Sequence, residues 1–93
     1  MRARWLVAAR ADLARIYDFN AQRSEAYAAR VDARLIERAD ALGRSPGMGR
    51  PSGKAGLRVL PVVDIQYVIT YAMVGDRVTI LRVHHARENR ETP

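Results

Sequence analysis

Residues 66–83 decide the fold, and they read QYVITYAMV, then GD, then RVTILRV. In the first run the larger apolar side chains occupy every second position: Tyr67, Ile69, Tyr71 and Met73. A period of two is typical of a half-buried β-strand. Gly75 and Asp76 follow as a two-residue turn, with glycine first as a type II′ turn requires. The stretch therefore predicts a β-hairpin with strands over residues 66–74 and 77–83.

A third strand and a long loop are predicted before this hairpin. Residues 57–63 are rich in Val and Leu, although Pro61 has no N–H for a central strand and indicates an edge or a bulge. Residues 43–56 hold five of the six glycines and three cations without an acid. We predict a functional loop there, suited to phosphate or carboxylate. It is not a Walker loop, because the Gly-Lys-Ser/Thr ending is missing.

The N-terminal half carries two patterns with helical spacing. Apolar residues recur every three or four positions, which predicts amphipathic helices over residues 8–20 and 25–42. Ser24 suits the N-cap of the second helix, and Gly43 suits a left-handed residue at its end. Three charged positions of the first helix lie off its apolar stripe and are expected to face solvent: Arg10, Asp12 and Arg15.

Residues 5–7 predict a short first strand, so the expected element order is β-α-α-β-β-β. The short connection between the two helices predicts an antiparallel helical hairpin. We therefore expect a single α+β domain over residues 1–93, in which this hairpin packs on one face of a mainly antiparallel sheet. The other face of the sheet stays open.

Composition excludes several classes of function. The 93 residues include no cysteine, which removes disulfides, thiolate metal sites and cysteine nucleophiles. No apolar run approaches the roughly 18 residues that a membrane span needs. The apolar stretch that begins at Trp5 is too short for a signal peptide. We expect a cytoplasmic protein with no membrane partner, no metal and no cofactor.

Positive charge is concentrated in the middle of the chain. The formal net charge is +6, and residues 43–64 contribute four basic side chains against one acidic. Such a patch attracts an anionic partner, either a nucleic acid or an acidic protein segment. The simpler interpretation is that surface arginine only keeps the domain soluble.

Two histidines end the last predicted strand. Adjacent residues on a strand point to opposite faces, so only one of His84 and His85 is expected to face a given groove. Histidine can act as a general acid or base near neutral pH. The adjacent pair is a poor indication of a metal site, because no convincing further ligand accompanies it. The simpler alternative is that both histidines only pack against the sheet or cap it.

Arginine accompanies the same strands. Arg58 and Arg82 lie between apolar residues, where an arginine is costly to bury unless it meets an acid such as Asp64 or Glu37. Otherwise each faces a groove that receives an anion. With Arg87 and the histidines, these arginines could stabilise the negative charge that develops on the phosphate during metal-free RNA cleavage. They could equally bind an acidic helix.

Several pieces of the sequence, taken in order, carry a resemblance to a known family. They are ADL with IYD in residues 11–18, SPGMGRP in 45–51, GLRVL in 56–60, YVITY in 67–71 and VTILRVHHAR in 78–87. This order resembles the RelE/ParE superfamily of toxins from bacterial type II toxin–antitoxin modules. The resemblance implies the RelE/ParE-like fold and a toxin that a cognate antitoxin holds inactive, as a toxin–antitoxin hetero-oligomer.

The resemblance also separates two activities. Ribosome-dependent ribonucleases of the RelE branch usually carry an arginine after the first tyrosine of the central strand, where this chain has Val68. They commonly use a tyrosine in the C-terminal tail, which has no aromatic residue here. The ParE branch poisons DNA gyrase and typically lacks a full nuclease set. The resemblance therefore favours gyrase as the target, with the ribosome and its messenger RNA as the alternative. A non-toxic, diverged binding module is a third interpretation.

Each interpretation implies its own site residues. If the chain is ParE-like, it is not an enzyme, and Arg50, Lys54, Arg58 and Arg87 are expected to contact the target. If it is a ribonuclease, the catalytic candidates are His84, His85, Arg58, Arg82 and Arg87, with His84 matching a histidine that some ribonuclease relatives use. We expect Arg58, Arg82, His85 and Arg87 to gather on the open face or edge of the sheet, near the loop of residues 43–56.

Overall fold

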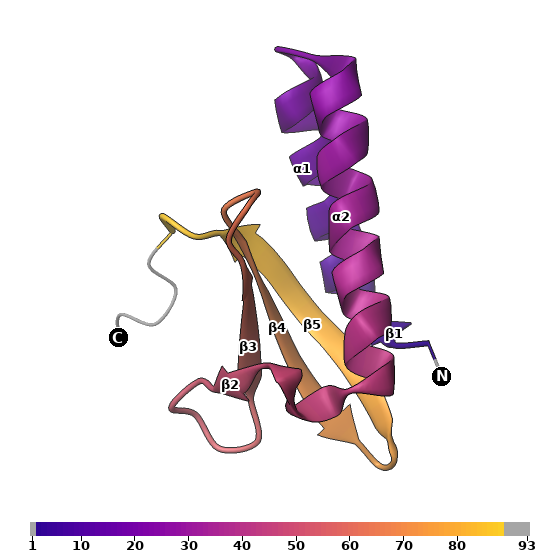
Figure 1. The fold of residues 1–93 in the computed structure, drawn as a ribbon, viewed down its shortest axis with the longest axis vertical. Helices are drawn as coiled ribbons and strands as arrows, with labels where there is room; N and C mark the ends of the chain where they lie inside the picture. Colours follow the sequence, from indigo (N-terminus) through magenta and orange to yellow (C-terminus); the bar gives the residue numbers. More distant parts are fainter. Residues whose placement is uncertain (1, 89–93) are drawn as a thin grey trace.

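The computed structural model describes residues 2–88 and contains a five-stranded sheet with a helical hairpin on one face (Figure 1). Its elements are β1 (Arg4–Trp5), α1 (Val7–Ala21), α2 (Glu25–Arg44), the 3₁₀ turn η1 (Pro46–Met48), β2 (Arg50–Pro51), β3 (Arg58–Val62), β4 (Tyr67–Val74) and β5 (Arg77–His85). The strand order is β1-β5-β4-β3-β2, and every pair is antiparallel except β1 with β5. The predicted α+β class and helical hairpin are confirmed.

The predicted β4–β5 hairpin forms as expected, with one irregularity. Gly75 has φ +66°, and Val74 pairs with Arg77 across the two-residue turn. Farther along, Tyr71 pairs with Ile80 while Thr70 pairs with Arg82, so Leu81 is an extra residue in β5. Such a β-bulge bends a strand and redirects the side chain beside it. The sequence pattern did not predict this bulge.

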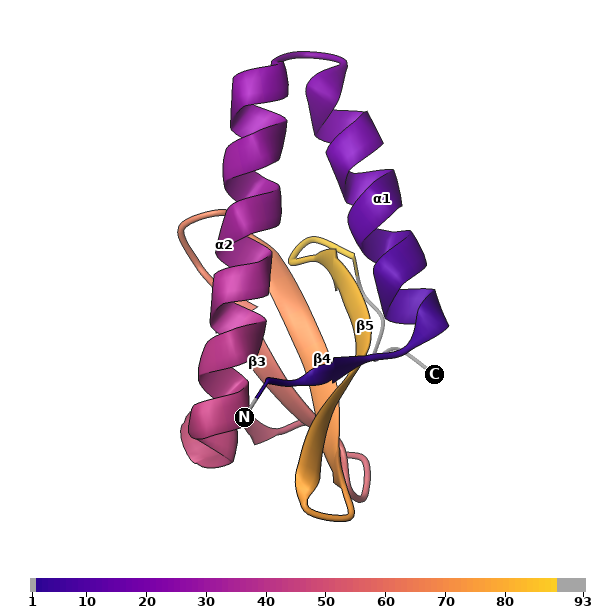
Figure 2. The same ribbon diagram turned by 90° about the vertical axis from the view of Figure 1, so that its right-hand side faces the viewer.

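The core lies between the helical hairpin and the sheet face that β4 and β5 present to it (Figure 2). The predicted stripe of α2 is buried throughout: Ala28, Val31, Leu35, Ala39 and Leu42. Tyr67, Ile69 and Tyr71 meet it from alternate positions of β4. Within residues 2–88, neither helix combines the length and apolar character needed to cross a membrane.

The structure differs from the predictions at the first strand, at the end of α2 and in the loop of residues 43–56. The first strand ends at Trp5, because Val7 already begins α1. Gly43 does not end α2 in a left-handed conformation, since the helix continues to Arg44 and the N–H of Ser45 still donates to the carbonyl of Ala41. The helix ends at Arg44, and Ser45 after it has left the helical region (φ −138°, ψ 76°), since a following proline disfavours that region for the residue before it. Residues 43–56 are not structureless either, because they contain η1 and β2.

Tyr71 fixes the first part of this loop to the sheet. Its side chain is fully buried, and its hydroxyl donates to the carbonyl of Pro46 (2.7 Å) and accepts the N–H of Gly49 (2.9 Å). Arg58 donates to the carbonyl of Gly49 through Nη2 (2.6 Å). A Cβ at Gly49 would lie 2.5 Å from the Tyr71 hydroxyl and 2.6 Å from the carbonyl oxygen of Val59. Only glycine therefore lets the loop approach Tyr71 this closely.

We predict that Gly49→Ala lowers the free energy of unfolding by about 1–3 kcal/mol, because the added methyl group forces the loop off Tyr71. Gly47→Ala is the matched control, since a Cβ there meets nothing within 4 Å. Urea unfolding of both variants tests the difference. Equal stability of the two variants would show that the close approach at Gly49 is not required.

Candidate functional site

A cleft of about 610 Å³ lies on the sheet face opposite the helices. Its floor includes Val59, Thr70 and Arg82, which are successive cross-strand partners on β3, β4 and β5. We call it the open-face cleft, and these residues line it: Arg50, Ser52, Gly53, Lys54, Leu57, Val59, Val68, Thr70, Arg82, His84, Ala86, Arg87 and Glu88. The loop after β2 and the turn after β5 thus face each other across the sheet.

The cleft brings together most of the site residues predicted from the sequence. Arg50, Lys54, Arg82, Arg87 and His84 all line it. They come from β2, the following loop, β5 and the turn after β5. The segment around the predicted basic loop and the end of the last strand are therefore parts of one surface.

Two predicted site residues lie elsewhere. The ring of His85 meets the ring of Tyr67 edge to face, with centroids 5.1 Å apart, and His85 lines a different cavity from His84. The two histidines thus face opposite sides of the sheet, as expected for neighbours on a strand. Arg58 is not among the lining residues of the cleft, and it donates to the Tyr71 hydroxyl and the Gly49 carbonyl rather than to an acid.

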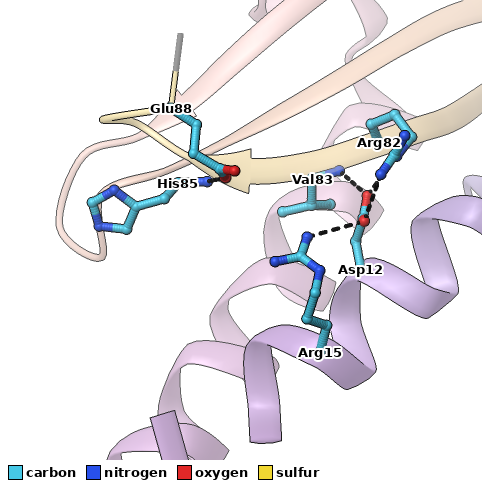
Figure 3. Close-up of polar contacts among 6 residues, drawn as sticks. All are labelled: Asp12, Arg15, Arg82, Val83, His85 and Glu88. Atoms are coloured by element: carbon cyan, nitrogen blue, oxygen red, sulfur yellow. Dashed lines mark hydrogen bonds and ion pairs between the residues drawn. The ribbon is translucent and has the colours of Figure 1, made fainter. Parts of the chain in front are cut away.

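Asp12 joins α1 to the edge of β5, and the prediction that this residue faces solvent was wrong. Its side chain is only 3% exposed. Its carboxylate accepts Nε and Nη2 of Arg82 (2.8 and 3.0 Å), the backbone N–H of Val83 (2.8 Å) and Nη2 of Arg15 (3.1 Å) (Figure 3). We call this cluster the Asp12 clamp.

The reason for the clamp is the shortness of β1. That strand pairs only with Thr79 and Ile80 of β5, so the outer edge of β5 beyond them has no neighbouring strand. Buried backbone N–H groups need an acceptor. Asp12 supplies it for the buried N–H of Val83, and at the exposed end of the strand Glu88 Oε1 accepts the N–H of His85 (2.9 Å). Helical spacing alone could not show that α1 runs beside this edge.

Arg82 pairs with a different acid from the two that were predicted. The candidate acids were Asp64 and Glu37, but both of them pair with Arg34 of α2. Arg82 is held by Asp12 while its own side chain stays 48% exposed in the cleft. Burial by itself raises the pKa of Asp12, and the hydrogen bonds from Arg82, Val83 and Arg15 outweigh it, so the pKa falls to about 2.

A second cavity, of about 510 Å³, lies on the helix side, where the hairpin extends past the end of the sheet (Figure 1). We call it the hairpin-end groove, and it is lined by Phe19, Asn20, Arg23, Ser24, Tyr27, Ile65, Gln66, Tyr67 and His85. Phe19 is 61% exposed there. Asn20 is buried and donates to the Tyr67 hydroxyl (3.2 Å) and to the carbonyl of Ile16 (2.9 Å). Within residues 2–88, no cluster of three histidine or carboxylate side chains could hold a metal ion.

We predict that the Asp12 clamp contributes acid-sensitive stability. The folded pKa of Asp12 is lowered, so its contribution is complete above about pH 4 and is lost as the pH falls toward 2. The shift from 3.8 to about 2 corresponds to about 2 kcal/mol. Asp12→Asn should therefore be less stable at pH 6 and lose less stability on acidification than the unmodified chain.

Urea unfolding at several pH values between 2 and 6 measures this difference. Asp18→Asn, on the exposed side of the same helix, controls for the loss of one negative charge. If Asp12→Asn and Asp18→Asn change equally with pH, the clamp is not the source of the acid sensitivity.

Known proteins are similar to this chain in both sequence and fold. The family model described as "ParE toxin of type II toxin-antitoxin system, parDE" matches residues 3–90. A relative from Sinorhizobium fredii named "Putative toxin Y4kP" is 38% identical over 87 residues, which cover 94% of this chain and 90% of the relative. Toxin RelE2 of Caulobacter vibrioides is 42% identical over 82 residues, which cover 88% of this chain and 91% of the relative.

A solved structure described as the chromosomal ParDE toxin–antitoxin system from P. aeruginosa superposes with a TM-score of 0.83 and 27% identity. The match covers 94% of this chain and 97% of that chain. The resemblance found in the sequence is thus confirmed along nearly the whole chain. The protein belongs to the ParE toxin family of type II toxin–antitoxin systems.

Proposed function

We propose that this toxin acts by inhibiting DNA gyrase, and that the open-face cleft contacts its target. The observation that supports this proposal best is Val68. In ribonucleases of the RelE branch, the corresponding position usually carries an arginine, whereas here an apolar side chain lies in the cleft. Arg50, Lys54 and Arg87 are the proposed contacts with the target, because their positively charged side chains line the cleft.

In this proposal Arg58 has a structural role rather than a direct contact with the target. It reaches the loop through the carbonyl of Gly49 and the hydroxyl of Tyr71, so we assign it to holding the loop in place. Loss of Arg58 would then weaken the target surface indirectly.

A ribosome-dependent ribonuclease is the second candidate, and one observation favours it. His84, Arg82 and Arg87 line the same cleft, and they are an imidazole and two guanidinium groups of the kind that metal-free RNA cleavage uses. The position of His85 on the helix side removes it from that set. His84 is therefore the residue that distinguishes the two functions.

We also propose that an acidic antitoxin segment neutralises the toxin in the cytoplasm by forming a hetero-oligomer with it. The hairpin-end groove offers exposed apolar surface at Phe19 and Tyr27. Arg23 lines the groove, and Arg30 lies over the ring of Tyr27, 5.2 Å from its centroid. An amphipathic helix with acidic residues beside its apolar face matches this combination.

We predict that the purified toxin inhibits DNA supercoiling by gyrase and that its expression produces filamentous cells with DNA-damage signalling. Arg87→Ala should reduce both effects at least severalfold, because it removes a cation from the cleft without removing a buried side chain. His84→Gln should retain both effects. Supercoiling assays and expression of each variant in cells measure the outcomes.

Arg10→Ala, on the exposed side of α1, is the control for charge loss alone. Rapid arrest of translation with messenger RNA cut at defined codon positions, abolished by His84→Gln, would contradict gyrase inhibition and establish the ribonuclease alternative.

A further prediction concerns antitoxin binding. Charge complementarity between an acidic segment and a +6 toxin accelerates encounter, whereas buried apolar surface sets the lifetime of the complex. We expect the association rate to fall about tenfold or more between low and high salt, with little change in the dissociation rate. Stopped-flow or surface-binding kinetics with the cognate antitoxin measure both rates. An association rate that does not depend on salt would show that the basic excess does not serve the antitoxin.

A further inference from the structure

The open-face cleft gathers positive charge from separate parts of the chain. Arg50, Lys54, Arg82 and Arg87 line it, and Glu88 is the one carboxylate among its described lining residues. That carboxylate accepts the backbone N–H of His85. The cleft therefore presents hydrogen-bond donors with a net positive charge to any molecule that enters it.

The Asp12 clamp orders one of these donors in advance. Arg82 uses Nε and Nη2 for Asp12, which lies behind the cleft on the helix side. A guanidinium group has five N–H donors, so this fork leaves further donors on a side chain that is 48% exposed. A ligand in the cleft then meets an arginine that is already immobilised, which lowers the entropic cost of binding it.

The floor of the cleft restricts the class of ligand. Its apolar part is formed by Leu57, Val59 and Val68, and among the described lining residues the imidazole of His84 is the one aromatic ring. Single-stranded bases are commonly held by stacking on several Phe, Tyr or Trp side chains, and none of these lines the cleft within residues 2–88, so basic side chains rather than stacking surfaces dominate it. Its donors suit the oxygens of phosphate.

An extended acidic peptide fits the cleft less well. Peptides that join a sheet pair with a free strand edge, whereas this cleft lies on the face of the sheet. The nearby edge of β5 is capped at Val83 by Asp12 and at His85 by Glu88. The peptide would therefore bind without backbone pairing.

We propose that the open-face cleft is a phosphate-binding site in which Arg82, held by Asp12, is the central donor and Arg50, Lys54 and Arg87 surround the anion. The phosphate is either a free anion or a diester of a nucleic-acid backbone. Only the source of the phosphate in the cell rests on the proposed function, because a toxin bound to gyrase would lie beside the backbone of the DNA that gyrase holds. The binding itself does not depend on gyrase.

Calorimetric titration of the full chain with inorganic pyrophosphate, a short DNA duplex and a glutamate-rich peptide tests the proposal. We expect pyrophosphate and the duplex to bind more tightly than the peptide. A combined Arg50→Ala, Lys54→Ala and Arg87→Ala variant should lose at least about tenfold in affinity for both phosphate ligands. A combined Arg2→Ala, Arg10→Ala and Arg44→Ala variant removes the same charge from exposed positions outside the cleft and should lose less than about threefold.

Arg15 provides a second control at the clamp. Arg82 and Arg15 both pair with Asp12, but only Arg82 lines the cleft. Arg82→Lys keeps the charge and loses the fork, so it should weaken pyrophosphate binding at least about fivefold, whereas Arg15→Lys should leave it unchanged. Thermal unfolding of each variant confirms that it is folded at the temperature of titration.

Three outcomes would overturn the proposal: no binding of either phosphate ligand, tighter binding of the peptide, or equal losses in the two triple variants. Binding of pyrophosphate without binding of the duplex would support a free anion as the ligand. Binding of both would support a nucleic-acid backbone. A toxin that binds phosphate at the cleft and leaves supercoiling unaffected would contradict gyrase inhibition while retaining the site.

Discussion

The contact between Asp12 and the outer edge of β5 holds the two layers of this toxin together at the point where the sheet is incomplete. β1 covers only Thr79 and Ile80, so the longest strand would otherwise expose backbone N–H groups beside the core. A buried carboxylate that accepts two arginines and a backbone N–H repays the cost of its burial, as the lowered pKa of Asp12 indicates. The same carboxylate holds the guanidinium group of Arg82, whose side chain lines the cleft on the opposite face. One residue of the helical layer therefore sets both the closure of the sheet and the arrangement of the cleft.

Tyr71 has a comparable role at the other end of the cleft. It is buried against the helices, yet its hydroxyl reaches Pro46 and Gly49, so the core dictates where the basic loop lies. Arg58 reinforces that position through the Gly49 carbonyl. The surface side chains of the cleft can consequently vary without loss of the loop's place, because the residues that position it are internal.

Local patterns predicted most of the secondary structure, because the alternation in β4 and the stripe of α2 each report burial on one face. They also predicted the basic character of the loop and the separation of His84 from His85. Asp12 was misplaced for a physical reason: a helical stripe identifies apolar contact, whereas Asp12 is buried by hydrogen bonding to a strand 71 residues away. The bulge at Leu81 and the hydrogen bond by which Arg58 holds the loop were not predicted for the same reason. Both depend on pairing between segments that are distant in the sequence. Gly43 was misread because Pro46, rather than the glycine, ends the helix.

The order of the strands has a consequence for biosynthesis. The edge that β1 and α1 close belongs to β5, which is translated after all the other elements of the described chain. Contacts between such distant segments form late, because a long loop of chain must be closed before they are gained. On a translating ribosome, the Asp12 carboxylate has no β5 edge to bind until that strand emerges. The sheet and its cleft are thus completed only after β5 has been made, so the surface that the cleft presents does not exist on a chain that ends before that strand.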